Sequence, residues 1–185
     1  MRKGKSRATP TIVPLKTPLF DFYTKPNAPA SYPYETIMKF SLAEMEKNHD
    51  YIQYLFPTIT VSQYHPSPTL TEQEIQLFKK SFCKKGGKNK FKKALAKMSE
   101  FYGFTGTNFR RKPNFPQRSQ IWLTPYNHNF MRISRMLESL NLLGFKKEAA
   151  SFFRALTKLY EDPLYKDVIG KSYDFWRDRA NTGKA

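Results

Sequence analysis

The chain has 185 residues, of which 39% are hydrophobic and 16% aromatic, so it can form one domain with a core and is too aromatic for a disordered chain. Its formal net charge of +17 would attract polyanions such as nucleic acid, although a solvated basic surface is the commoner explanation. The single cysteine, Cys83, excludes an internal disulfide, and no apolar run approaches the roughly 18 residues that span a bilayer.

The N-terminal third predicts an extended segment in front of a helical domain. Residues 1–18 carry the sequence RKGKSR without an apolar anchor, which indicates a flexible basic arm. Residues 19–23, LFDFY, hold three aromatic residues in five and should pack onto the domain. We therefore expect an arm over 1–18, one domain over 19–181 and a short tail over 182–185.

Two capping boxes mark helix starts in the next part of the chain. Ser41 followed by Glu44 begins a helix that Pro57 ends, and the weak helix formers at 48–50 favour a break within it. Thr71 followed by Glu74 begins a second helix, which the glycines near Gly86 close.

Apolar spacing predicts the remaining helices. A stripe over 91–102 ends at Gly103, after which 105–120 is polar, basic and interrupted by two prolines, as in a loop. Thr124 and Pro125 should open a helix that ends before Gly144, and further helices follow over 146–160 and around 166–180. With no convincing alternating strand, we expect an all-α, single compact domain of about six helices.

Several ordered motifs resemble the conserved N-terminal domain of the opioid growth factor receptor family, in the form of its compact prokaryotic-type members. They are NHDYIQYLFP at 48–57, FYG at 101–103, WLTPYNHNFMRISRMLESLNLLG at 122–144 and YDFWRDRA at 173–180. The chain departs from the family pattern at Tyr54, where Trp is usual, and at Ser134, where Thr is usual. The resemblance implies opioid growth factor receptor activity, the binding of an enkephalin-like peptide that animal members show, and membrane or nuclear association.

The start of the helix after Trp122 is the first candidate binding site. His128, Arg132, Arg135 and Ser139 share a stripe away from the apolar face. Together with the side-chain amides of Asn127 and Asn129 near the helix start, they could hold a carboxylate or phosphate. A structural role is the favoured alternative, with Arg135 paired to Glu138 and Arg132 satisfying carbonyls of another segment.

The motif at 48–57 supplies possible partners for this stripe. Asp50 and Gln53 share a helix face, so we predict that one of them lies within hydrogen-bonding reach of 127–135. Such a polar junction would lock two helices together, either as a buried network or as part of a site.

The basic loop before Trp122 is the second candidate. We predict that Arg110, Arg111 and Arg118 rim a concave surface with Asn127, His128 and Arg132 at its floor, to which an anionic group binds. A disordered basic loop without such a floor is the competing hypothesis.

The motif search indicates binding rather than catalysis. The sequence has no phosphate-binding glycine loop, zinc signature or nucleophile elbow, and its three histidines are scattered. We therefore expect a non-enzymatic, receptor-like binding domain without metal or cofactor, whose partner is a peptide or other anionic ligand. The alternative is a basic protein associated with nucleic acid or another polyanion. We expect a soluble protein in the cytoplasm, with a nuclear or peripheral membrane location as the alternatives that the resemblance implies.

Overall fold

The computed structural model describes residues 16–62, 67–84 and 86–181. The predicted arm up to residue 15 and the tail over 182–185 lie outside the described residues, and Pro18 already opens the first helix. The elements are α1 Pro18–Thr24, α2 Tyr34–Lys39, α3 Leu42–Lys47, α4 Tyr51–Leu55, α5 Glu72–Ser81, α6 Gly87–Phe101, β1 Phe104–Thr105, β2 Arg110–Arg111, α7 Phe115–Trp122, α8 Asn129–Leu142, α9 Lys146–Tyr160, α10 Pro163–Ile169 and α11 Ser172–Asn181.

The fold is predominantly helical, as the sequence predicts, but the helices are shorter and more numerous. Eleven occur in the described part of the chain instead of about six. The additional ends fall where the backbone cannot continue a helix. Asn48, with φ −88° and ψ 139°, separates α3 from α4, and Gly170, with φ 49°, separates α10 from α11.

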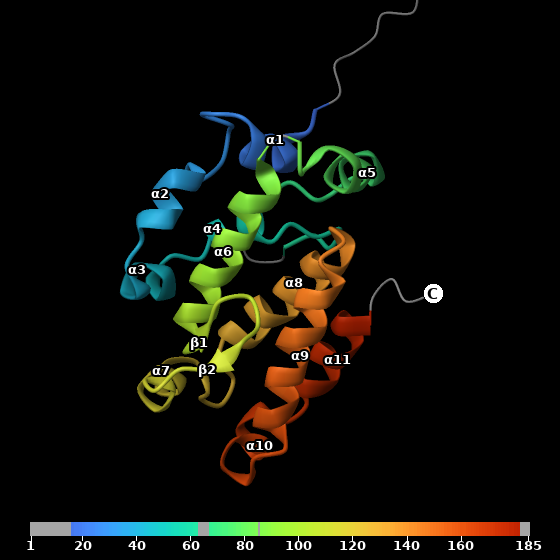
Figure 1. Cartoon of the computed structure of the whole chain (residues 1–185). Coiled ribbons are helices and arrows are strands. Elements are labelled where there is room, and N and C mark those ends of the chain that lie inside the picture. Colours follow the sequence, from blue (N-terminus) through green and yellow to red (C-terminus); the bar gives the residue numbers. More distant parts are fainter. Residues whose placement is uncertain (1–15, 63–66, 85, 182–185) are drawn as a thin grey trace, which may run out of the picture.

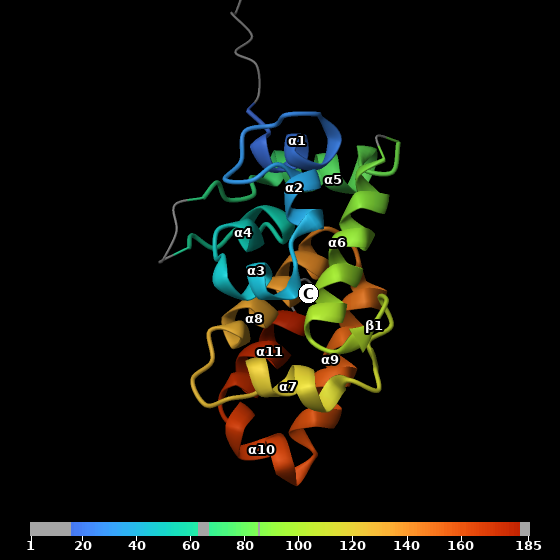
Figure 2. The same cartoon turned by 90° about the vertical axis from the view of Figure 1, so that its left-hand side faces the viewer.

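The helices form two groups that meet along the middle of the molecule. In Figure 1, α6 runs through the upper group beside α1, α2, α3 and α5, while α8, α9 and α11 pack together below and to the right. Figure 2, turned by 90°, shows α3 and α4 directly above the start of α8, with α7 below it. The family-like motifs at 48–57 and 122–144 therefore face one another.

Aromatic side chains fill the upper core. Phe91 of α6 is fully buried and stacks on Phe145 at 4.5 Å between ring centroids, and Tyr23 of α1 packs edge-on against Phe82. The segment 19–23 is therefore a buried helix. Tyr54, at the position where the family usually has Trp, is partly buried beside the ring of Phe22.

One buried carboxylate joins the first helix to this group. Both predicted capping boxes are present, and in the second the Glu74 side chain accepts hydrogen bonds from the backbone N–H groups of Leu19 and Phe20 in addition to its own cap at Thr71. A negative charge at two helix N-termini satisfies donors that have no partner within a helix. Glu74 thus fixes α1 to the start of α5.

Two expectations between Gly103 and Asn129 are wrong. The segment 105–120 is not a plain loop, because most of the β1–β2 hairpin and most of the helix α7 fall within it. The next helix does not start at Thr124 and Pro125. Tyr126 has a left-handed φ of 58°, which no right-handed helix accommodates, and α8 begins only at Asn129.

Candidate functional site

Two asparagines build the start of α8. The Asn127 side-chain oxygen accepts a hydrogen bond from the backbone N–H of Asn129 at 3.0 Å, and its amide nitrogen donates to Thr124 Oγ1 and to the carbonyl of Ile121. Asn129 is fully buried and donates through Nδ2 to Asn127 and to the carboxylate of Glu46 on α3. Both side chains are therefore used in positioning the helix.

Arg132 joins α8 to the α3–α4 connection. Its side chain is only 5% exposed. Nη1 donates to the carbonyl of Met45 at 3.0 Å, Nη2 donates to the carbonyl of Asn48 at 2.7 Å, and Nη2 lies 3.2 Å from Nδ1 of His49. These contacts support the structural role that the sequence left open, because they occupy most of the donors of the guanidinium group.

Arg135 and Arg118 bind the ends of other helices in the same way. Arg135 Nη1 donates to the carbonyl of Phe56, the residue that ends α4, and Arg118 donates twice to the carbonyl of Phe101, the last residue of α6. A cation there satisfies carbonyls that lack an intrahelical partner and offsets the negative end of the helix dipole. Burial lowers the pKa of both arginines, which stay charged because the pKa of free arginine exceeds about 12.

A polar junction joins the end of α3 and the α3–α4 connection to the start of α8. Glu46, His49 and two backbone carbonyls face the 127–135 segment. Gln53 is buried, and its side chain lies near Ser62 instead. Glu46 and His49 flank the break at Asn48, where the chain turns before α4 begins, and the bond expected from Asp50 or Gln53 stays a prediction.

Two histidines share this junction. The rings of His49 and His128 meet edge to face at 4.9 Å between centroids, and His128 Nε2 lies 3.4 Å from a Glu46 oxygen. Burial lowers the pKa of His128, with a further lowering by the charges of Arg132 and His49, while Glu46 opposes the shift. His128 is therefore held in its neutral form more strongly in the folded chain than in the unfolded chain.

This shift predicts that the fold loses stability in mild acid. Since the unfolded chain takes up the His128 proton at a higher pH, the stabilisation is complete above the ordinary histidine pKa of about 6.5 and is lost as pH falls through the lower folded value. We expect the melting temperature to fall between about pH 8 and about pH 5, and to fall less steeply in a His128→Gln variant. Thermal unfolding followed by circular dichroism across that range measures both slopes; equal slopes would contradict the assignment to His128.

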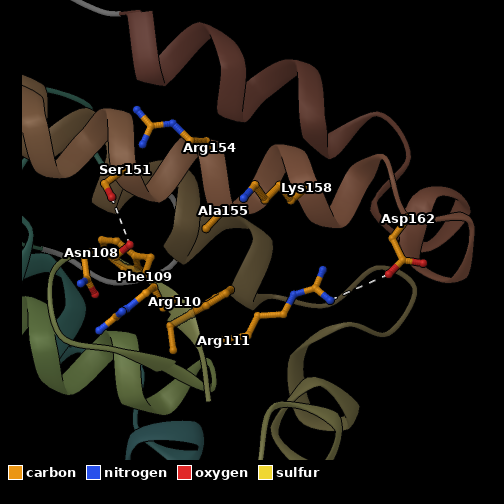
Figure 3. Close-up of a pocket in the computed structure, with 10 residues that line it drawn as sticks. Asn108, Phe109, Arg110, Arg111, Ser151, Arg154, Ala155, Lys158 and Asp162 are labelled. Carbon is orange, nitrogen blue, oxygen red and sulfur yellow. Dashed lines mark hydrogen bonds and ion pairs between the residues drawn. The ribbon is translucent and has the colours of Figure 1, made fainter. Parts of the chain in front are cut away.

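A pocket of about 630 Å³ lies between the β1–β2 hairpin and α9 (Figure 3). We call it the hairpin pocket and define it by its lining residues: Phe104, Asn108, Phe109, Arg110, Arg111, Ser151, Arg154, Ala155, Lys158 and Asp162. Its size is in the range of ordinary small-ligand sites.

The hairpin is fixed to α9 by two contacts. The ring of Phe109 stacks on Phe152 at 4.3 Å with an interplanar angle of 19°, and Ser151 Oγ donates to the carbonyl of Asn108. Phe109 has a left-handed φ of 52°, which is unusual for a residue with a large side chain. This backbone carries the ring into the core and brings the next two residues, Arg110 and Arg111, to the pocket.

The second predicted site is thus present in part. Arg110 and Arg111 line a concave surface, but α9 supplies its other wall, and Asn127, His128 and Arg132 are not among the residues of the hairpin pocket. Arg118 is directed to Phe101 instead. This corrects the predicted floor. Sequence reasoning missed Arg154, Lys158 and Asp162, although the four-residue spacing of Arg154 and Lys158 on a helix places them on one face.

No helix in the described part of the chain combines the length and apolar character that a bilayer crossing requires. No group of three or more His, Cys, Asp or Glu side chains in the same part of the chain is arranged to hold a metal ion.

Comparisons with known proteins agree with the motifs. Residues 18–171 match the opioid growth factor receptor conserved region. The chain is 38% identical over 131 residues to opioid growth factor receptor-like protein 1 of Mus musculus, covering 68% of this chain and 25% of that protein. It is 36% identical over 121 residues to the protein of the same name from Xenopus tropicalis, covering 63% and 22%, and 37% identical over 117 residues to the opioid growth factor receptor of Rattus norvegicus, covering 60% and 19%.

These relatives are much longer than the aligned region. The chain spans at most about a quarter of each of them. No solved structure matches the chain.

Proposed function

The chain belongs to the opioid growth factor receptor family, and we propose from this premise that it is a non-enzymatic, receptor-like binding domain whose ligand carries negative charge. One relative is named the opioid growth factor receptor, and for this chain we propose a peptide ligand. The proposal depends on the geometry of one site rather than on the name.

The charge balance of the hairpin pocket is the main support for an anionic ligand. Four cationic side chains, Arg110, Arg111, Arg154 and Lys158, line it together with one carboxylate, Asp162. Arg111 lies 3.9 Å from Asp162. Among the described residues, the other three cations have no carboxylate within 4 Å. An anionic group can bind there without first displacing an internal partner.

The polyanion function is the second candidate, and a different surface favours it. Exposed lysines surround the α5–α6 turn without a carboxylate partner within 4 Å among the described residues: Lys79, Lys80, Lys84 and Lys88. Together with the net charge of +17 they suit a phosphate backbone.

A binding comparison tests the two functions. We expect a labelled enkephalin-like peptide to bind saturably near physiological salt, and a generic DNA duplex to bind only at low salt, because phosphate contacts release counterions. Fluorescence anisotropy at two salt concentrations measures both. DNA binding that survives physiological salt, without any peptide binding, would favour the second function and reject the first.

A cytoplasmic location is part of the same proposal. Cys83 is exposed and forms no disulfide, and a free surface thiol is typical of a reducing compartment. The nuclear and peripheral membrane locations implied by the family are the alternatives, which imaging of a tagged chain in its own cell distinguishes.

A further inference from the structure

We propose that the hairpin pocket is a carboxylate subsite, which holds the C-terminal carboxylate of a peptide together with the apolar side chain that precedes it. This inference rests on the proposed function, since it specifies which part of an anionic ligand the domain recognises. It follows from the charges at the pocket rim, the apolar surface beneath them and the way both are held.

The rim presents cations from two separate elements. Arg154 and Lys158 lie one turn apart on the same face of α9, and Arg110 follows from β2 on the opposite wall (Figure 3). All three side chains are exposed. Cations on both walls are therefore available to an anion in the pocket, and a guanidinium group can bind both oxygens of a carboxylate at once.

Part of the pocket lining is apolar. Phe104, Phe109 and Ala155 supply this part, although the two phenylalanines expose only 1% and 3% of their surface. A ligand whose charge is attached directly to an apolar group matches this arrangement, because the anion reaches the cations while the apolar group covers the floor.

Asp162 restricts the charge of that ligand. Its carboxylate lies at the end of the pocket, 3.9 Å from Arg111, and Arg111 also lies over the ring of Phe115 at 4.9 Å. A phosphate ester, which carries about two negative charges at neutral pH, would be repelled by Asp162 and would gain little from the apolar floor. A monoanionic carboxylate is repelled less by Asp162 than a dianionic phosphate is.

Three contacts fix the hairpin to the neighbouring helices. The Phe109–Phe152 stack and the Ser151 hydrogen bond fix the hairpin to α9, and Lys112 Nζ, which follows β2, lies 3.1 Å from a Glu100 oxygen on α6. Walls that do not move on binding reduce the ordering that a ligand must impose. The inference therefore needs no conformational change.

The test uses three small probes with the full chain labelled with ¹⁵N. The probes are N-acetylphenylalanine as its carboxylate, the matching N-acetylphenylalanine amide, and inorganic phosphate. We expect the carboxylate to shift the backbone amide signals of Arg110, Arg111 and Ser151 saturably. The amide should bind at least about tenfold more weakly than the carboxylate, because it lacks the charge-assisted hydrogen bonds.

Matched variants locate the site. Arg154→Gln and Lys158→Gln should each weaken carboxylate binding about tenfold. Lys147→Gln, which removes a charge from an exposed residue of the same helix outside the pocket, should leave it unchanged. The exposed positions of Arg154 and Lys158 allow both variants to fold.

The outcomes separate this inference from the proposed function. Equal binding of acid and amide, tighter binding of phosphate, or equal effects of Arg154→Gln and Lys147→Gln would overturn the carboxylate subsite. If the labelled peptide of the preceding experiment still binds, the receptor-like function stands without this subsite. If neither the peptide nor any anionic probe binds, both are rejected.

Discussion

Replacing Arg132 with Met should lower the free energy of unfolding by about 3–5 kcal/mol. Methionine has a similar length and fills the space, but it takes a donor from the part-buried carbonyl of Asn48 and leaves the buried carbonyl of Met45 with the Tyr51 hydroxyl alone. It also removes the positive partner of Glu46, which lies 3.7 Å from Nη1. Unpaired buried polar groups account for the size of the effect. Urea unfolding followed by helical circular dichroism measures it.

Two further variants make this result specific. Arg154→Met removes the same charge from an exposed position and should change stability by no more than about 0.5 kcal/mol. The free energy of unfolding of Arg132→Lys should lie between those of Arg132→Met and the native chain. A single ammonium group cannot reach two carbonyls in the geometry of the guanidinium fork. If Arg132→Met unfolded at the same urea concentration as Arg154→Met, the Arg132 contacts would have no structural role.

Local sequence patterns correctly predicted those helix starts and ends that depend only on residues close in the chain. Ser41 with Glu44 and Thr71 with Glu74 form the two capping boxes, and Gly103 adopts the left-handed φ of 83° that the end of α6 requires. The break between α3 and α4 was also evident from 48–50, where asparagine and aspartate disfavour a helix. Each feature requires only a few consecutive residues.

The elements that were missed lack such local patterns. The strands β1 and β2 are two residues long and too short to show alternation, and α7 begins next to Pro116 with few apolar residues in a regular spacing. Their stability comes from tertiary contacts, such as the Phe109–Phe152 stack. Without that contact, nothing in 105–121 distinguishes it from a basic loop.

In the candidate sites, too, local sequence patterns are predictable and contacts between distant residues are not. The polar stripe that contains Arg132 was evident from helical spacing, but the roles of its members depend on carbonyls more than 80 positions earlier in the chain. The hairpin pocket depends on bringing Arg110 and Arg154 to opposite walls of one pocket. A single sequence gives no measure of that distance, so the arginines that line the pocket could not be separated from those that bind helix ends.

Trp122→Ala should destabilise the fold by about 3–5 kcal/mol, a typical cost for removing a fully buried indole. Trp122 ends α7 and packs edge-on against Tyr102 at 5.1 Å between ring centroids. Its Nε1–H donates to the Tyr102 carbonyl at 3.2 Å, so the substitution leaves both a cavity and a buried carbonyl without this donor. Since Trp122 joins α7 to the end of α6, the loss should unfold the whole domain rather than α7 alone.

Trp122→Phe separates the two contributions to that loss. Phenylalanine retains most of the apolar volume but not the donor, so we expect about 1–2 kcal/mol from the unsatisfied carbonyl and a small cavity. Phe175→Ala provides the control for aromatic truncation at an exposed site, since Phe175 is 66% exposed, and should change stability by less than about 0.5 kcal/mol. Denaturant unfolding followed by circular dichroism compares all three variants with the native chain. A loss for Trp122→Ala no larger than that for Phe175→Ala would mean that α7 is not packed as described, and that Trp122 does not connect it to the rest of the fold.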